Sequence, residues 1–98
     1  MNKPRLEKHI VKEIIDFLRQ HGWAVKTHGG AFAAGEPDVS ACIRGRSVHF
    51  EVKRSPKHEA TPLQLAKLKR WGDAGSLVGV VSSVADVEGI LRNAGLVR

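Results

Sequence analysis

Polar and apolar residues alternate along two neighbouring segments in the middle of the chain. An apolar residue at every second position is typical of a strand with one buried face. The first segment covers residues 38–43 and the second covers residues 47–53. Arg44-Gly45-Arg46 lies between them, and Gly45 suits the positive φ that a two-residue turn requires. The pattern therefore predicts an antiparallel β-hairpin.

The register of this hairpin determines which side chains meet. With Gly45 and Arg46 as the loop, Ser40 pairs with Glu51 and Asp38 pairs with Lys53. Asp38 and Glu51 are then diagonal neighbours, roughly 7–8 Å apart at the backbone. One face of the hairpin is polar and carries Asp38, Ser40, Cys42, His49, Glu51 and Lys53. The other is apolar and carries Val39, Ala41, Ile43, Val48, Phe50 and Val52.

Apolar residues recur at helical spacing before the hairpin. They predict a helix from about Pro4 to Gly22, with Pro4 in the first turn and Gly22 at the C-terminal stop. Glu7 falls on the apolar face, where a carboxylate is costly without a partner, and a bound cation would be one. The alternative is that Glu7 only interacts favourably with the helix dipole.

The other elements follow from turn and capping signals. Residues 23–28 are expected to form the first strand, followed by a loop of small residues over 29–35. Thr61 and Pro62 suit the first positions of a helix that ends near Asp73. Its expected apolar stripe is Leu65, Leu68 and Trp71, with Lys67, Lys69 and Arg70 facing outward.

The end of the chain completes a mixed α/β pattern. Residues 77–82 predict a buried strand, and Ser83 with Asp86 predicts the capped start of a last helix reaching Gly95. The order is αβββαβα, which predicts a mixed sheet flanked by helices. The strand at 77–82 should run parallel to a neighbour through a right-handed crossover.

Composition and charge narrow the class of protein. Ninety-eight residues suit a single domain, and 42% hydrophobic with 27% charged residues is typical of soluble globular proteins. No apolar run reaches the length of a membrane span and the start lacks a signal peptide, so a cytoplasmic location is expected. A lone cysteine, Cys42, excludes an intrachain disulfide. The net charge of +6 favours a polyanionic partner such as nucleic acid.

Two carboxylates with a nearby lysine suit a hard divalent cation. Mg²⁺ is commonly held by one or two carboxylates together with phosphate oxygens of the substrate. Asp38 and Glu51 would hold the ion, and Lys53 would orient a nucleophile or stabilise developing charge. This is the chemistry of phosphodiester hydrolysis. The alternative is a surface hairpin whose charged residues are merely solvated.

Gly35-Glu36-Pro37-Asp38, followed after twelve residues by Glu51-Val52-Lys53, resembles the signature of the PD-(D/E)XK nuclease superfamily. Its Gly-x-Pro-Asp form resembles the VRR-NUC (virus-type replication-repair nuclease) branch, in which Glu7 and Gln64 match further motif positions. The resemblance implies Mg²⁺ or Mn²⁺ bound by Asp38, Glu51, the Val52 carbonyl and Glu7. It also implies that Lys53 is catalytic and that Glu7 and Gln64 complete the site.

The resemblance extends to the substrate and the assembly. It implies an endonuclease that acts as a homodimer on branched DNA such as four-way junctions. A homodimer would also bury Leu96 and Val97, which have no evident partner within the chain. The alternatives are a catalytically silent nucleic-acid-binding module, or a nuclease acting on RNA or linear DNA. The candidate contacts to nucleic acid are Lys26, His28, Arg54, Lys57, Lys67 and Arg70.

Overall fold

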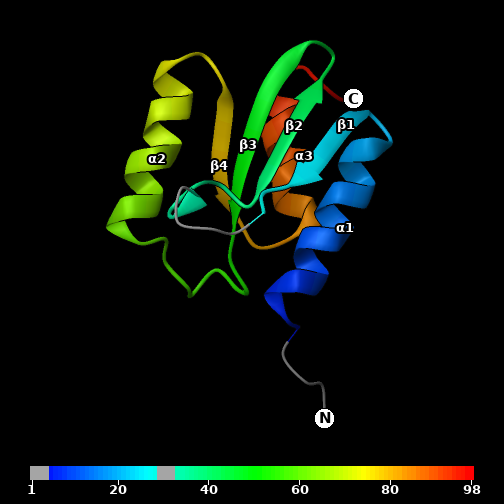
Figure 1. Ribbon diagram of the computed structural model, residues 1–98. Coiled ribbons are helices and arrows are strands. Elements are labelled where there is room, and N and C mark those ends of the chain that lie inside the picture. Colours follow the sequence, from blue (N-terminus) through cyan, green and yellow to red (C-terminus); the bar gives the residue numbers. More distant parts are fainter. Residues whose placement is uncertain (1–4, 29–32) are drawn as a thin grey trace.

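A four-stranded mixed sheet flanked by helices forms the protein in the computed structural model (Figure 1). The structure describes residues 5–28 and 33–98. The elements in chain order are α1 (Glu7–Arg19), β1 (Gly22–Lys26), β2 (Val39–Ile43), β3 (Arg46–Val52), α2 (Pro62–Asp73), β4 (Leu77–Val81) and α3 (Val84–Asn93). The predicted order αβββαβα is therefore confirmed. The predicted position of Pro4 and most of the predicted 29–35 loop lie outside the described residues.

The strands lie in the order β1-β2-β3-β4. β1 and β3 are antiparallel to β2, and β4 is parallel to β3. Parallel neighbours need a crossover connection, which α2 provides between β3 and β4. The predicted parallel pairing of the last strand is confirmed. Within the described residues, no helix combines the length and the apolar composition needed to cross a bilayer.

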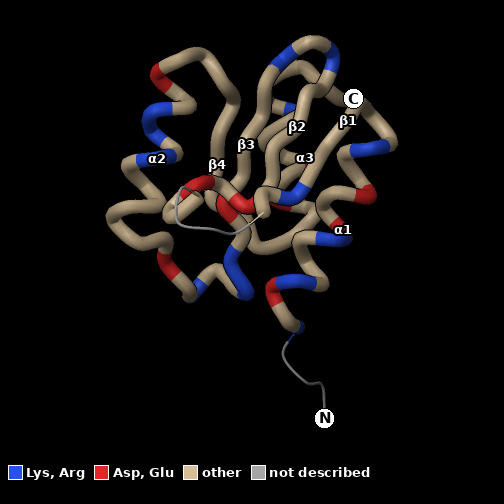
Figure 2. Tube along the Cα trace, viewed as in Figure 1, with Lys and Arg blue, Asp and Glu red and all other residues tan. Residues whose placement is uncertain are grey.

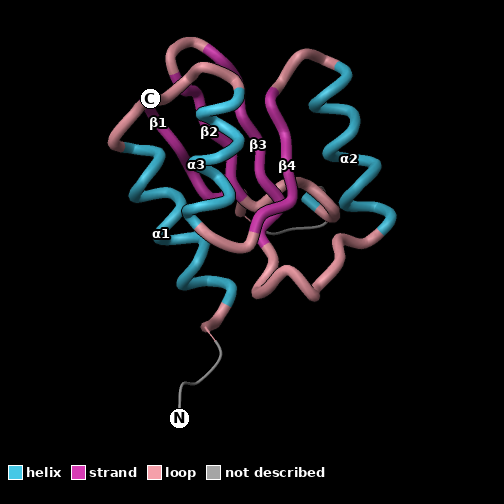
Figure 3. The backbone as a smooth tube through the Cα atoms, turned by 180° about the vertical axis from the view of Figure 1, so that it is seen from behind, coloured by secondary structure: helices cyan, strands magenta, loops and turns pink. Residues whose placement is uncertain are grey.

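The helices divide between the two faces of the sheet. α1 and α3 pack together on one face, which is turned toward the viewer in Figure 3. α2 packs on the other face, against β3 and β4. The predicted apolar side of the hairpin faces α1 and α3, and its residues Val39, Ile43, Val48, Phe50 and Val52 are fully buried. They pack with the buried residues of the two helices, Ile10, Val11, Ile14, Leu18, Val87 and Leu91.

The hairpin register differs from the predicted one by two residues. Ile43 pairs with Arg46, so the loop is Arg44-Gly45, with φ of 51° and 82°. Two positive φ values in a two-residue loop define a type I′ turn, whose twist matches the flanking strands. Because a shift of two preserves side-chain alternation, both faces keep the predicted residues. Continuing the observed pairing by one position places Asp38 directly opposite Glu51, closer than the predicted diagonal.

Two boundary predictions and two burial predictions are corrected. α1 ends at Arg19 and Gly22 begins β1, because the chain must turn before it can pair with Ile43. β1 ends at Lys26, two residues earlier than predicted. Glu7 is exposed in the first turn of α1 and does not point into the core. Leu96 and Val97 pack against the core, so they do have partners within the chain.

α2 and β4 are less buried than their apolar residues suggested. Thr61 caps α2 in a capping box with Gln64, as its position predicted. In the predicted stripe only Leu68 is buried, whereas Leu65 is 50% exposed and Trp71 is 37% exposed. The reason is that α2 covers the polar face of the sheet. β4 is an edge strand, which leaves Val80 41% exposed.

The Arg44→Asn substitution is expected to stabilise the protein by about 1 kcal/mol, because asparagine tolerates positive φ better than arginine. Thermal unfolding should show this as a gain of about 4–8 °C in Tm. Arg46→Asn is the matched control, since it removes the same charge from an exposed strand position. An equal gain in both variants would attribute the effect to charge and contradict the turn assignment.

Candidate active site

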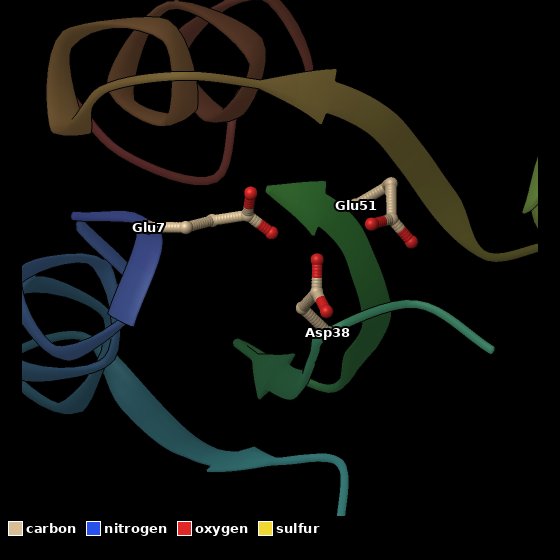
Figure 4. A group of neighbouring side chains, drawn as sticks. All are labelled: Glu7, Asp38 and Glu51. Atoms are coloured by element: carbon tan, nitrogen blue, oxygen red, sulfur yellow. The ribbon is translucent and has the colours of Figure 1, made fainter. Parts of the chain in front are cut away.

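Three carboxylates from separate parts of the chain converge where β2 begins and β3 ends (Figure 4). Glu7 comes from the first turn of α1, Asp38 directly precedes β2, and Glu51 lies near the end of β3. One carboxylate oxygen from each residue lies within 4.8 Å of the others. Glu7 is exposed and Asp38 is half-buried, while only 2% of Glu51 is exposed. The structure thus brings together the three acids that the sequence singled out.

Local backbone geometry explains why Asp38 lies there. Gly35 has a φ of 78°, and a Cβ atom on it would lie 2.6 Å from Leu63. Both observations favour glycine at this position. The Thr27 amide donates to the Asp38 carbonyl over 2.9 Å, and the Val52 amide donates to Asp38 Oδ2 over 2.8 Å. Asp38 is therefore held between the end of β1 and the end of β3.

Lys53 points into the same site. Its Nζ donates to Gln64 Oε1 over 2.9 Å and lies 3.6 Å from Glu51 Oε2. The side chain is 13% exposed, so it is not merely solvated, as the alternative interpretation of the hairpin assumed. Gln64 Oε1 also accepts from the Thr61 amide over 2.9 Å. The capping box of α2 therefore fixes the amide that orients Lys53.

Burial and crowding make the ionised form of Glu51 costly. Burial is the main cause that raises the pKa of Glu51 to about 8, and the neighbouring Asp38 carboxyl adds to it through a hydrogen bond and charge. Lys53 acts in the opposite direction. A divalent cation between the carboxylates would offset this penalty, and oxygen ligands suit Mg²⁺ or Mn²⁺. The three acids thus fit a hard divalent cation.

The candidate contacts to nucleic acid are distributed around this site. Arg54 and Lys57 are exposed on the loop that leaves β3, and Arg70 is exposed on α2. Lys67 instead forms an ion pair with Glu36 over 3.4 Å and is only 26% exposed. Lys26 and His28 are exposed at and after the end of β1. Figure 2 shows basic segments on both sides of the acidic positions that meet below β2 and β3.

Sequence reasoning missed a polar layer between α2 and the sheet. His49 is 5% exposed and stacks on Trp71 with ring centroids 3.8 Å apart. Its ring nitrogens bond the hydroxyls of Ser40 and Ser47, and burial lowers the pKa of His49. Trp71 Nε1 donates to Glu36 over 3.0 Å, which lowers the pKa of that carboxyl. The available signals were Glu36 inside the Gly-x-Pro-Asp segment and His49 on the polar face.

Solved structures share this fold. A VRR_NUC domain protein superposes with a TM-score of 0.75 at 16% sequence identity, covering 94% of this chain and 89% of that chain. A second structure, a VRR_NUC domain, has a TM-score of 0.62 at 26% identity and covers 87% of this chain and 89% of its own. No protein-family model matches the sequence, and comparison with curated proteins gives no match.

Both neighbours are matched over nearly their whole length, so the likeness extends beyond a shared motif to the mixed sheet and its helices. The Gly-x-Pro-Asp and Glu-x-Lys segments contribute two of the three converging carboxylates. The chain therefore has the fold of these VRR_NUC domains, which supports the resemblance that its sequence motifs indicated.

Proposed function

We propose that the chain is a divalent-metal-dependent endonuclease that hydrolyses phosphodiester bonds in DNA. The observation that carries this proposal is the convergence of Glu7, Asp38 and Glu51 within 4.8 Å. Lys53 lies 3.6 Å from the innermost of these carboxylates. Burying a glutamate to 2% exposure beside a second acid costs free energy, and a surface hairpin with merely solvated charges would not show this arrangement.

The acids and one carbonyl would hold the cation. Asp38 and Glu51 are the central ligands, with the Val52 carbonyl and Glu7 completing the set. Mg²⁺ or Mn²⁺, when bound, supplies Lewis-acid chemistry and neutralises charge on the phosphate. The Val52 amide holds one oxygen of Asp38 in place, which leaves less reorganisation to occur when the ion binds.

Lys53 would act on the reacting phosphate. Its ammonium group is oriented by Gln64 and is not extended into solvent. A positioned cation can stabilise the negative charge that develops in the transition state or orient the attacking water. Gln64 acts through Lys53 and is a positioning residue.

The basic residues around the site would bind the DNA backbone. Phosphate contacts fix the position of the duplex and carry no sequence information. Arg54, Lys57 and Arg70 are the leading candidates, and Lys26 and His28 would contact DNA on the β1 side. Lys67 would have to exchange its ion pair with Glu36 for a phosphate.

Lys53→Ala is expected to lower the cleavage rate by about 10²–10³-fold, while DNA affinity and Tm change little. The assay uses labelled linear and four-way DNA with Mg²⁺ or Mn²⁺, and EDTA should abolish cleavage by the unmodified protein. Lys69→Ala is the matched control, because Lys69 is exposed and pairs with Asp73 on α2. Full activity in Lys53→Ala would remove the catalytic assignment.

Glu51→Gln should weaken binding of Mg²⁺ and raise the Tm of the metal-free protein near pH 8. A carboxyl whose folded pKa is about 8 contributes stability below its unfolded pKa and loses it as the pH rises through about 8. As the pH rises toward about 8, the Tm of the unmodified protein should therefore fall more steeply than the Tm of the variant. Asp38→Asn should also weaken the metal affinity, since it removes charge from an oxygen ligand.

Calorimetric titration and thermal unfolding over pH measure these effects. Glu88→Gln is the control, because Glu88 lies on α3 and pairs with Arg92 at the surface. Unchanged metal affinity in both site variants would contradict the proposed metal centre. A parallel Tm profile for Glu51→Gln and the unmodified protein would contradict the burial penalty.

The assembly and the DNA structure form the last part of the proposal. A domain of this size spans only a short stretch of duplex, and a two-fold homodimer would present two symmetric sites. We expect light scattering at micromolar concentration to give a dimer mass, and four-way junctions to be cut faster than linear DNA on opposing strands. A monomer mass with equal cleavage of both substrates would overturn this part and leave the nuclease proposal standing.

A further inference from the structure

A cavity of about 410 Å³ opens at the carboxyl ends of the parallel strands β3 and β4. The Lys53 amide donates to the Val81 carbonyl over 2.8 Å. Beyond this bond the segments that follow β3 and β4 separate. After β3 the chain leads to α2 on one face of the sheet, and after β4 it leads to α3 on the other. In α/β sheets, such a divergence of neighbouring connections opens a crevice that commonly binds ligands.

The cavity adjoins the candidate active site. Lys53 lines it, and so does Val80, which is the β4 pairing partner of Glu51. Neighbouring strands lie about 4.8 Å apart, so the wall of the cavity at Val80 is one strand spacing from the backbone of Glu51. The other lining residues belong to the loop after β3, to the end of β4 and the residue after it, and to α3, and the proposed chemistry uses none of them.

The lining is apolar inside and hydrogen-bonding at the rim. Val80, Val81 and Ile90 provide aliphatic surface. Ser55, His58 and Asp86 are among the residues that provide polar groups. An aliphatic surface with a few directional polar groups is the composition of sites for flat organic ligands, and the volume is within their usual range.

We propose that this cavity holds the base of an unpaired nucleotide next to the phosphate that is cut. The inference rests on the proposed nuclease function and specifies its substrate. A second phosphate is a poorer ligand here, because Lys53 is the one cationic side chain among the lining residues and the proposed chemistry already uses it at the reacting phosphate. Asp86 adds a negative charge that repels a phosphate and accepts hydrogen bonds from a base.

The polar groups at the rim are held in fixed positions. Asp86 Oδ2 accepts from the Ser82 amide over 2.9 Å and from the Ser82 hydroxyl over 3.1 Å. Both bonds use Oδ2, so Oδ1 can accept from the exocyclic amino group of a base. The His58 ring bonds Ser55 Oγ over 2.7 Å and Arg54 Nη2 over 2.8 Å. These bonds fix the plane of an imidazole on which a base can stack.

A base in this cavity must leave the stack of its duplex. That step costs free energy for a paired base and least for one that is mismatched or already single-stranded. The cavity therefore selects for an unpaired nucleotide beside the cut, as occurs at forks, gaps and junctions. This selectivity requires neither a dimer nor base-specific contacts in a groove.

The first test replaces single bases in the substrate and leaves the protein unchanged. In a forked DNA with a known cut site, each nucleotide flanking the cut is replaced in turn by an abasic analogue, which keeps every phosphate. We expect kcat/KM to fall about tenfold at one flanking position and to change little two or more nucleotides away. Equal rates for all abasic substrates would overturn the proposal.

The second test fills the cavity. Val80→Trp should lower kcat/KM about tenfold on the base-containing fork but leave the rate on the sensitive abasic fork unchanged. Val25→Trp is the matched control, because Val25 is 43% exposed on the opposite edge strand and Val80 is 41% exposed. The Tm of both variants checks folding. If Val80→Trp is unfolded, the abasic series decides alone. An equal loss on both forks in a folded Val80→Trp would overturn the proposal.

Failure of the proposed function gives a different result. If the unmodified protein cuts no DNA with Mg²⁺ or Mn²⁺, nuclease activity is refuted. Binding of the same oligonucleotides by fluorescence anisotropy in EDTA then tests the base site. Loss of affinity for the abasic forms supports it, and equal affinity overturns it. Saturable binding of free deoxyadenosine monophosphate without any abasic effect would identify a free-nucleotide site and also overturn the proposal.

Discussion

One hydrogen bond from a backbone amide to a side-chain carboxylate organises the candidate active site. The Val52 amide donates to Asp38 Oδ2 over 2.8 Å and so ties the start of β2 to the end of β3. This bond uses an amide at a strand end, and its acceptor is a charged oxygen, which makes it stronger than a neutral bond. It keeps Asp38 beside Glu51, where two carboxylates would repel each other if both were ionised.

The cost of that arrangement falls on Glu51. A glutamate with 2% exposure, a second acid beside it and a pKa raised to about 8 is destabilising when ionised. Proteins retain such costs mainly at functional sites, where the ligand repays them. The core on the opposite face, with five fully buried residues from the hairpin alone, supplies the stability that makes the cost tolerable.

α2 links the polar face of the sheet to the chemistry of the site. Its position depends on a stack between His49 and Trp71 and on the bond from Trp71 to Glu36, instead of a broad apolar contact. The first turn of the same helix carries Gln64, which holds Lys53. The helix that closes the polar face therefore also sets the direction of the Lys53 ammonium group, and its departure from β3 helps to open the adjacent cavity.

The sequence alone determined the element order, the two faces of the hairpin and the identity of the converging acids. These follow from local rules, since alternation assigns side chains to faces whatever the register, and a shift of two residues changed no face.

Only the tertiary structure decided that Asp38 lies opposite Glu51 and that Glu7 reaches them from α1. It also decided that Leu65 stays exposed while Leu96 is packed. It also decided that Lys53 is held by Gln64 and borders a cavity with Asp86. The physical reason is that these contacts join residues far apart in the chain, and no local periodicity or capping signal records which distant side chain will lie across the space between two elements.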